Sequence, residues 1–153
     1  MEKYKQILII IFVFISGIVI GGYLFAKTQP RSFISLNNCE HCLQPKELAG
    51  LVGSVAINSA PLLIQPVAIM ETDKTVAIKN PVPEAAVDYV IIPKKDIKDV
   101  GELSNADKIY LDDVYAVIER LIEKYKLRKY QVVTYGPDRQ QVRYLHFHLK
   151  SVE

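Results

Sequence analysis

The chain lacks an excess of charge of either sign once its N-terminal region is set aside. It contains 19 Lys and Arg and 17 Asp and Glu residues. Three of these Lys and one Glu lie in residues 1–27, so residues 28–153 carry 16 basic and 16 acidic residues. A surface that binds nucleic acid needs an excess of Lys and Arg. The balance therefore argues against a nucleic-acid-binding protein.

Side chains that carry metal or nucleophilic chemistry are also scarce. The 153 residues include only two cysteines and three histidines. Cys39 and Cys42 enclose His41, and the other two histidines are His146 and His148. No internal repeat and no low-complexity segment is present, so one domain of modest size is the expectation for the polar part of the chain.

One hydrophobic run dominates the N-terminal region. Ile7–Ala26 contains no charged residue and is long enough to cross a bilayer as a helix. A cleaved signal peptide is the alternative, but Leu24 is a poor match to the small residue expected three positions before a cut after Ala26. We therefore predict an uncleaved membrane anchor. Gly17 and Gly21 have the spacing at which two such helices approach closely.

These features divide the chain into a flank (residues 1–6), a transmembrane anchor (7–26), a linker (27–38) and a folded domain (39–153). Lys3 and Lys5 precede the anchor, and Lys27 and Arg31 follow it, so the flanking charges do not choose an orientation. Short N-terminal anchors preceded by Lys often leave the C-terminal domain outside. We expect a single-pass membrane protein with its domain on the extracytoplasmic side.

The domain shows alternating strand patterns around one clear helix. Ser104 and Asp107 have the spacing of a capping box, and apolar residues then recur every three or four positions. The predicted elements are a short helix at 45–57, strands at 67–71, 75–78, 89–92, 130–135 and 142–149, and the long helix that starts near residue 104. This order predicts an α+β fold, an antiparallel sheet with one long helix against it.

The last predicted strand carries two histidines on one face. Alternation places Leu145, Phe147 and Leu149 on the apolar side. It places Tyr144, His146 and His148 on the other side. Neutral imidazole is both a nucleophile and a metal ligand, so this face suits phosphoryl-type chemistry or metal binding. A solvent-facing strand that happens to carry two histidines is the alternative.

From Glu71 to Leu149 the order of these features resembles the histidine triad (HIT) domain. The matching pieces are the hairpin Glu71–Ile78, the loop Asn80-Pro-Val-Pro83, the strand Val90-Ile-Ile-Pro-Lys-Lys95, the long helix and the strand Gln140–Leu149. Cys39-x-x-Cys42 is similar to the family's N-terminal Cys pair. The resemblance implies a homodimer that binds a nucleotide and needs no cofactor for its chemistry.

Site residues carry over position by position. His146 matches the nucleophile that attacks the α-phosphorus and forms a nucleotidyl-histidine intermediate, and His148 matches the last triad histidine. The resemblance implies nucleotide contacts at five further positions: the phosphate at Gln140 and Gln141, the ribose at Asn80, and the base at Ile78 and Pro81.

Three expected histidines are replaced. Tyr144 occupies the first triad position, Asp88 precedes the strand that ends at Pro93, and Asp96 follows Lys95. In zinc-carrying members the Cys pair shares the metal with the positions matched here by Asp88 and Tyr144. Zinc at Cys39 and Cys42, a disulfide between them and two free thiols therefore stay open.

Two functions follow from this comparison. The first is a membrane-anchored HIT-type hydrolase or nucleotidyl transferase that acts on nucleoside phosphoramidates or related nucleotide conjugates. The alternative is a catalytically degenerate nucleotide- or metal-binding module tethered to the membrane, and a scaffold that only dimerises is a third reading. Nucleotides are abundant inside cells, so an enzyme would favour a cytoplasmic domain, against the orientation expected from the anchor.

Overall fold

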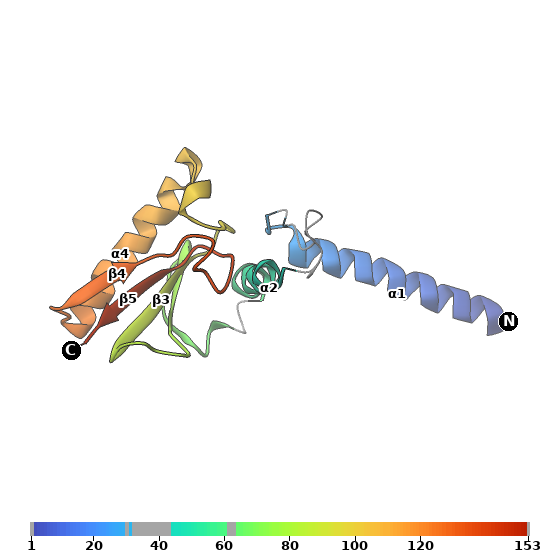
Figure 1. Cartoon of the computed structure of the whole chain (residues 1–153). Helices are drawn as coiled ribbons and strands as arrows, with labels where there is room; N and C mark the ends of the chain where they lie inside the picture. The colour runs from blue at the N-terminus through green and yellow to red at the C-terminus, as the bar shows by residue number, and fades with distance from the viewer. Residues whose placement is uncertain (1, 30, 32–43, 61–63, 153) are drawn as a thin grey trace.

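The computed structural model describes residues 2–29, 31, 44–60 and 64–152. Figure 1 shows a sheet with one long helix beside it and a separate N-terminal helix that points away from it. The elements are α1 (Glu2–Phe25), α2 (Pro45–Ser59), β1 (Ala68–Glu71), β2 (Thr75–Lys79), β3 (Val87–Pro93), the short 3-10 turns η1 (Val100–Glu102) and η2 (Asn105–Asp107), α4 (Lys108–Tyr125), β4 (Tyr130–Val133) and β5 (Phe147–Ser151).

The five strands form one sheet in the order β1-β2-β3-β5-β4, and every neighbouring pair is antiparallel. The predicted α+β class is confirmed. The turn between β1 and β2 is closed by Thr72, whose N–H donates to the Thr75 carbonyl at 2.9 Å. The Thr72 hydroxyl accepts from the Thr75 N–H at 2.9 Å. A threonine that bonds its neighbouring backbone in this way favours a tight turn.

The predicted capping box is present at the start of the long helix. The Ser104 N–H donates to Asp107 Oδ2 at 2.8 Å, and the Ser104 side chain accepts from the Asp107 backbone. Residues 105–107 form a 3-10 turn, so the regular helix α4 begins at Lys108. It ends where Lys126 takes a left-handed conformation with φ of 53°, which stops further helical hydrogen bonding.

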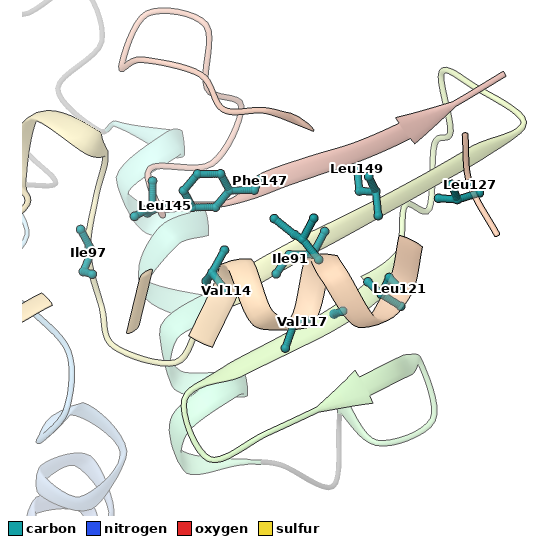
Figure 2. Packing of buried hydrophobic residues seen from close by; sticks show 11 residues of the cluster. Ile91, Ile97, Val114, Val117, Leu121, Leu127, Leu145, Phe147 and Leu149 are labelled. Carbon is teal, nitrogen blue, oxygen red and sulfur yellow. The ribbon is translucent and has the colours of Figure 1, made fainter. Parts of the chain in front are cut away.

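The main core lies between α4 and one face of the sheet. Val114, Val117 and Leu121 of α4 are fully buried against Ile91 of β3 and Leu149 of β5 (Figure 2). Because side chains alternate along a strand, the neighbours of these core residues point to the opposite face. This alternation sends Asp88 and His148 to the side of the sheet that α4 does not cover.

A second, smaller cluster packs on that opposite side. Ile57 of α2, Val76 of β2 and Tyr144 are all buried in it. The predicted strand 142–149 is shorter in the structure, since β5 begins at Phe147. The Tyr144 N–H bonds the Val142 carbonyl at 2.8 Å and the Leu145 N–H bonds the Ile97 carbonyl at 2.7 Å, so this part of the chain leaves the sheet ladder.

Because β5 begins at Phe147, Tyr144 lies before the strand, and the prediction for its side chain is wrong. Its side chain is only 3% exposed, and its hydroxyl donates to the Pro93 carbonyl at 2.9 Å. Tyr144 therefore does not share the open face with His146 and His148. A phenol that reaches a backbone carbonyl in this way is a buried packing residue with its polar end satisfied.

Helix α1 contains a segment, Lys3–Phe25, that is long and apolar enough to cross a membrane. Its side chains are not buried against the rest of the chain. The Ser59 hydroxyl at the end of α2 donates to the Leu24 carbonyl at 3.2 Å. This contact joins the C-terminal end of α1 to α2.

Candidate functional site

His146 and His148 lie side by side where β5 begins. Their ring centroids are 5.2 Å apart with the rings edge to face, and both residues are partly exposed. His148 belongs to β5 and pairs with Val90 of β3, while His146 directly precedes the strand. The structure therefore brings together the two histidines that the sequence selected.

The tautomer of His146 is determined by its neighbour in the backbone. His146 Nδ1 lies 2.6 Å from the Tyr144 carbonyl oxygen. A carbonyl oxygen only accepts hydrogen bonds, so Nδ1 carries the proton and Nε2 keeps its lone pair. Burial lowers the pKa of His146 and the nearby His148 lowers it further, although the bond to the carbonyl acts in the opposite direction. The ring is therefore neutral near pH 7, as a nucleophile requires.

Asp88 holds His148 from the adjacent strand. Its Oδ1 lies 3.2 Å from His148 Nδ1, and its Oδ2 accepts from Asn80 Nδ2 at 2.8 Å and from the Glu84 N–H at 3.0 Å. Burial by itself raises the pKa of Asp88, but these hydrogen bonds outweigh it, and the pKa lies below the ordinary value of 3.8. A charged Asp88 places the His148 proton on Nδ1 and orients the ring.

Asn80 takes part in this arrangement through its side chain. Its Nδ2 donates to Asp88, and its Oδ1 accepts from the Val82 N–H at 3.1 Å. Both ends of the amide are thus used within the loop. Of the two positions expected to contact a base, Pro81 is exposed and Ile78 packs against the cluster of Ile57, Val76 and Tyr144.

The two glutamines expected near a phosphate differ in their surroundings. Gln140 is 1% exposed, and its Nε2 donates to the Lys98 carbonyl at 3.1 Å. Its Oε1 is buried without a hydrogen-bond partner in the described part of the chain. Gln141 is exposed. Gln140 therefore packs against the loop after β3, and only Gln141 projects into solvent.

Three residues that were not selected from the sequence, Glu84, Tyr135 and Lys150, form a set of contacts next to His148. Lys150 Nζ donates to Glu84 Oε2 at 2.5 Å and to the Tyr135 hydroxyl at 3.2 Å. The Tyr135 ring meets His148 edge to face, with centroids 5.6 Å apart. Alternation was the available signal, because Lys150 follows His148 by two positions on the same strand. The Lys150 cation, paired with Glu84, is joined to His148 through the Tyr135 ring.

The three positions at which the sequence resemblance implied histidine, Tyr144, Asp88 and Asp96, are buried and have hydrogen-bond partners. Tyr144 donates to Pro93, Asp88 accepts from three donors, and Asp96 accepts from both the Arg31 guanidinium and the Gln29 N–H. Burial and the Asp96 carboxylate raise the pKa of Tyr144, so the phenol stays protonated.

The hydrogen-bond partners of Asp88 and Tyr144 test whether these two side chains could be zinc ligands. The Asp88 carboxylate accepts three hydrogen bonds, and the Tyr144 phenol keeps its proton and donates it to the Pro93 carbonyl. These two side chains do not fit a zinc ligand set. Within residues 2–29, 31, 44–60 and 64–152, no group of three His, Cys, Asp or Glu side chains is placed to hold a metal ion. Cys39 and Cys42 lie outside these residues, so the metal, disulfide and free-thiol alternatives for that pair remain predictions.

Comparison with known families identifies the family to which the chain belongs. Residues 63–153, more than half of the chain, match the family model described as "Scavenger mRNA decapping enzyme C-term binding". The fold is similar to a HIT family hydrolase from Clostridium thermocellum, with a TM-score of 0.57 and 26% identity over 76% of this chain and 91% of that one. The chain belongs to the histidine triad (HIT) family.

Other HIT structures agree on the fold. A HIT family hydrolase from Legionella pneumophila Philadelphia 1 gives a TM-score of 0.54 at 23% identity, over 57% of this chain and 81% of that one. A histidine triad protein from Clostridium difficile gives 0.51 at 20% identity, over 55% and 76%. No curated protein sequence gave a significant match.

Replacement of Asp88 by Asn tests the arrangement around His148. One oxygen of Asp88 becomes an NH₂ group that faces a donor, so we expect Asp88→Asn to lower the free energy of unfolding by about 1–3 kcal/mol at pH 7. The lowered pKa means that the charged carboxylate stabilises the fold above pH 3.8 and that this contribution is lost as the pH falls further. The difference between wild type and variant should therefore shrink below pH 3.8.

Denaturant unfolding of the full chain in detergent at several pH values measures this difference. Asp112→Asn, on the exposed side of α4, is the matched control and should leave stability unchanged at every pH. Equal stability of Asp88→Asn and wild type at pH 7 would show that the three hydrogen bonds to Asp88 do not hold the site.

Proposed function

We propose that this HIT protein is a nucleotide hydrolase or nucleotidyl transferase that acts through His146. Its substrates are nucleoside phosphoramidates or related nucleotide conjugates. The observation that carries the proposal is the 2.6 Å contact between His146 Nδ1 and the Tyr144 carbonyl, because it leaves an unprotonated Nε2 on a neutral, partly exposed ring. The hydrolase from Clostridium thermocellum, which has the same fold, supports the same reaction class.

The reaction has two displacements. His146 Nε2 attacks the α-phosphorus, a bond to phosphorus forms, and the bond from phosphorus to the leaving nitrogen or oxygen breaks while the leaving group takes up a proton from solvent. Water, or an acceptor alcohol in a transferase, then attacks the same phosphorus, passes its proton to His148 Nε2 and from there to solvent, releases the nucleotide and restores neutral His146. Imidazole is a good leaving group, so one difficult step becomes two easier ones.

Two neighbouring side chains, His148 and Lys150, assist the displacements in this proposal. His148, whose Nδ1 proton is held by Asp88, presents the lone pair of its Nε2 on the same face as His146, where it can accept the proton of the attacking water. Lys150 contributes a cation that Glu84 keeps in place, and this contact raises the pKa of Lys150. A fixed positive group beside a transferring phosphoryl group stabilises the charge that develops there, and Lys150 is the cation of this set. Neither group requires a bound cofactor.

The alternative is a binding module that has lost catalysis. It is favoured by one observation, the burial of Tyr144 where the first triad histidine belongs. Under this alternative the protein binds a nucleotide but does not turn it over. The nucleophile and its orienting carbonyl are both in place, which is why we prefer the enzyme.

Release of AMP from adenosine phosphoramidate tests the enzyme proposal. We expect the wild-type full chain in detergent to release AMP, and His146→Ala to lower kcat about a thousand-fold or more because the nucleophile is gone. Lys108→Ala, exposed at the start of α4, is the control and should keep the wild-type rate. Equal rates for wild type and His146→Ala would refute the proposal, and binding without turnover would support the alternative.

We further propose that α1 anchors the protein in a membrane and that the folded part pairs as a homodimer. The span Lys3–Phe25 supports the anchor by its length and composition. β4 lies at an edge of the sheet, with Tyr130 and Val132 exposed by 47% and 37%, so this strand offers a surface to a second copy. An extracytoplasmic domain is the orientation predicted from the sequence.

Two measurements on the full chain test the anchor and the pairing. After alkaline carbonate treatment the protein should stay in the membrane pellet, and light scattering in detergent should give the protein mass of two chains. Release into the supernatant would contradict the anchor, and the mass of one chain would contradict the dimer. A reporter fused at Glu153 that is active on one side only determines the orientation.

A further inference from the structure

A buried ion cluster surrounds Arg31, a residue that follows α1 in the sequence. Its side chain is fully buried, and so are the carboxylates on either side of it, with Asp96 1% and Glu47 5% exposed. Arg31 Nη1 lies 3.3 Å from Glu47 Oε2, Nε lies 3.3 Å from Asp96 Oδ2, and Nη2 contacts Asp96 Oδ1. Arg143 supplies the second cation, 3.7 Å from Glu47 and 3.4 Å from Asp99.

Arg31 also holds the backbone that orients the nucleophile. Its Nη1 donates to the Arg143 carbonyl at 2.5 Å, and its guanidinium carbon lies 5.9 Å from the centre of the Tyr144 ring. The next carbonyl along the chain is that of Tyr144, which accepts from His146 Nδ1. One peptide unit therefore separates the Arg31 contact from the oxygen that determines the His146 tautomer.

Residues 143–145 lie outside the sheet, where the buried Tyr144 and Leu145 side chains and two backbone hydrogen bonds to other segments also hold them. The Arg143 N–H donates to the Lys46 carbonyl at 3.1 Å, and the Leu145 N–H donates to the Ile97 carbonyl at 2.7 Å. Gly50 of α2 leaves room for the contact, since a Cβ there would clash with the Arg143 carbonyl and come within 2.6 Å of Arg31 Nη1. The close approach of α2, Arg31 and residue 143 thus depends on a position without a side chain.

We propose that Arg31 is a positioning residue for His146. By holding the peptide between Arg143 and Tyr144, it keeps the Tyr144 carbonyl directed at His146 Nδ1 and so keeps Nε2 available. The geometry of His146 then depends on Arg31, which follows α1. The buried Asp96 holds this part of the chain through the Arg31 side chain and the Gln29 N–H. The catalytic consequence rests on the function proposed above, whereas the effect on the tautomer does not.

The test uses the full chain in detergent with two readouts. Nitrogen-15 NMR of labelled histidines reports which ring nitrogen of His146 carries the proton, and AMP release from adenosine phosphoramidate gives kcat and KM. The variants are Arg31→Met and Arg31→Met/Asp96→Asn. The second variant removes the charge that the first leaves buried without its partner, so it tests positioning apart from the cost of an unpaired carboxylate. Arg120→Met, on the exposed side of α4, is the control.

Both Arg31 variants should lose the single Nδ1–H tautomer of His146, and kcat should fall about ten- to hundred-fold with KM unchanged. Arg120→Met should match wild type in every readout. A folded double variant that keeps the wild-type tautomer and kcat would overturn the proposal and leave Arg31 with a role in stability alone. If wild type releases no AMP, the function proposed above fails, and the tautomer measurement still decides the role of Arg31.

Discussion

The Tyr144 carbonyl oxygen accepts a hydrogen bond from His146, and an oxygen of this kind has no proton to offer in return. The proton on His146 must therefore sit on Nδ1, which leaves the far nitrogen of the ring with its lone pair. The reaction proposed for the chain needs a nucleophilic nitrogen at that place, and the Arg31 contact with the Arg143 carbonyl lies one peptide unit from this oxygen. Burial of the ring supports the same state, because it disfavours the charged imidazolium.

The structure gives a role to each of the three positions at which the resemblance predicted a replaced histidine. A comparison with the family suggests loss of function, because Tyr144, Asp88 and Asp96 stand where histidines are expected. In the structure each of them has a new task near the site. Tyr144 supplies the orienting carbonyl while its ring packs in the core, Asp88 holds His148, and Asp96 binds the Arg31 guanidinium. Their contacts fit a support for His146 and His148.

Local patterns in the sequence were enough for much of the fold. The capping box of Ser104 and Asp107 predicted the long helix, and alternation predicted that His146 and His148 share a face. Both depend on residues close together in the chain. The family resemblance, carried by the strand before Lys95 and the histidine pair, is confirmed by the match over residues 63–153.

What the sequence could not reveal depends on residues that are far apart. Alternation placed Tyr144 beside the histidines, but the backbone leaves the sheet before Phe147, so the phenol turns into the core. Arg31 gave no local signal within the predicted linker, since its partner Asp96 lies 65 positions away. Lys150 was within reach of the strand pattern, but its contacts with Glu84 and Tyr135 come from other segments.

The central claim is that His146 carries the nucleotide between the two displacements, and the covalent intermediate itself is the most direct evidence for it. Wild-type protein mixed with adenosine phosphoramidate and quenched in alkaline denaturant should yield a peptide that bears AMP on His146, detectable by mass spectrometry. Turnover of the substrate with no nucleotide on His146, or with the nucleotide on another residue, would contradict the account.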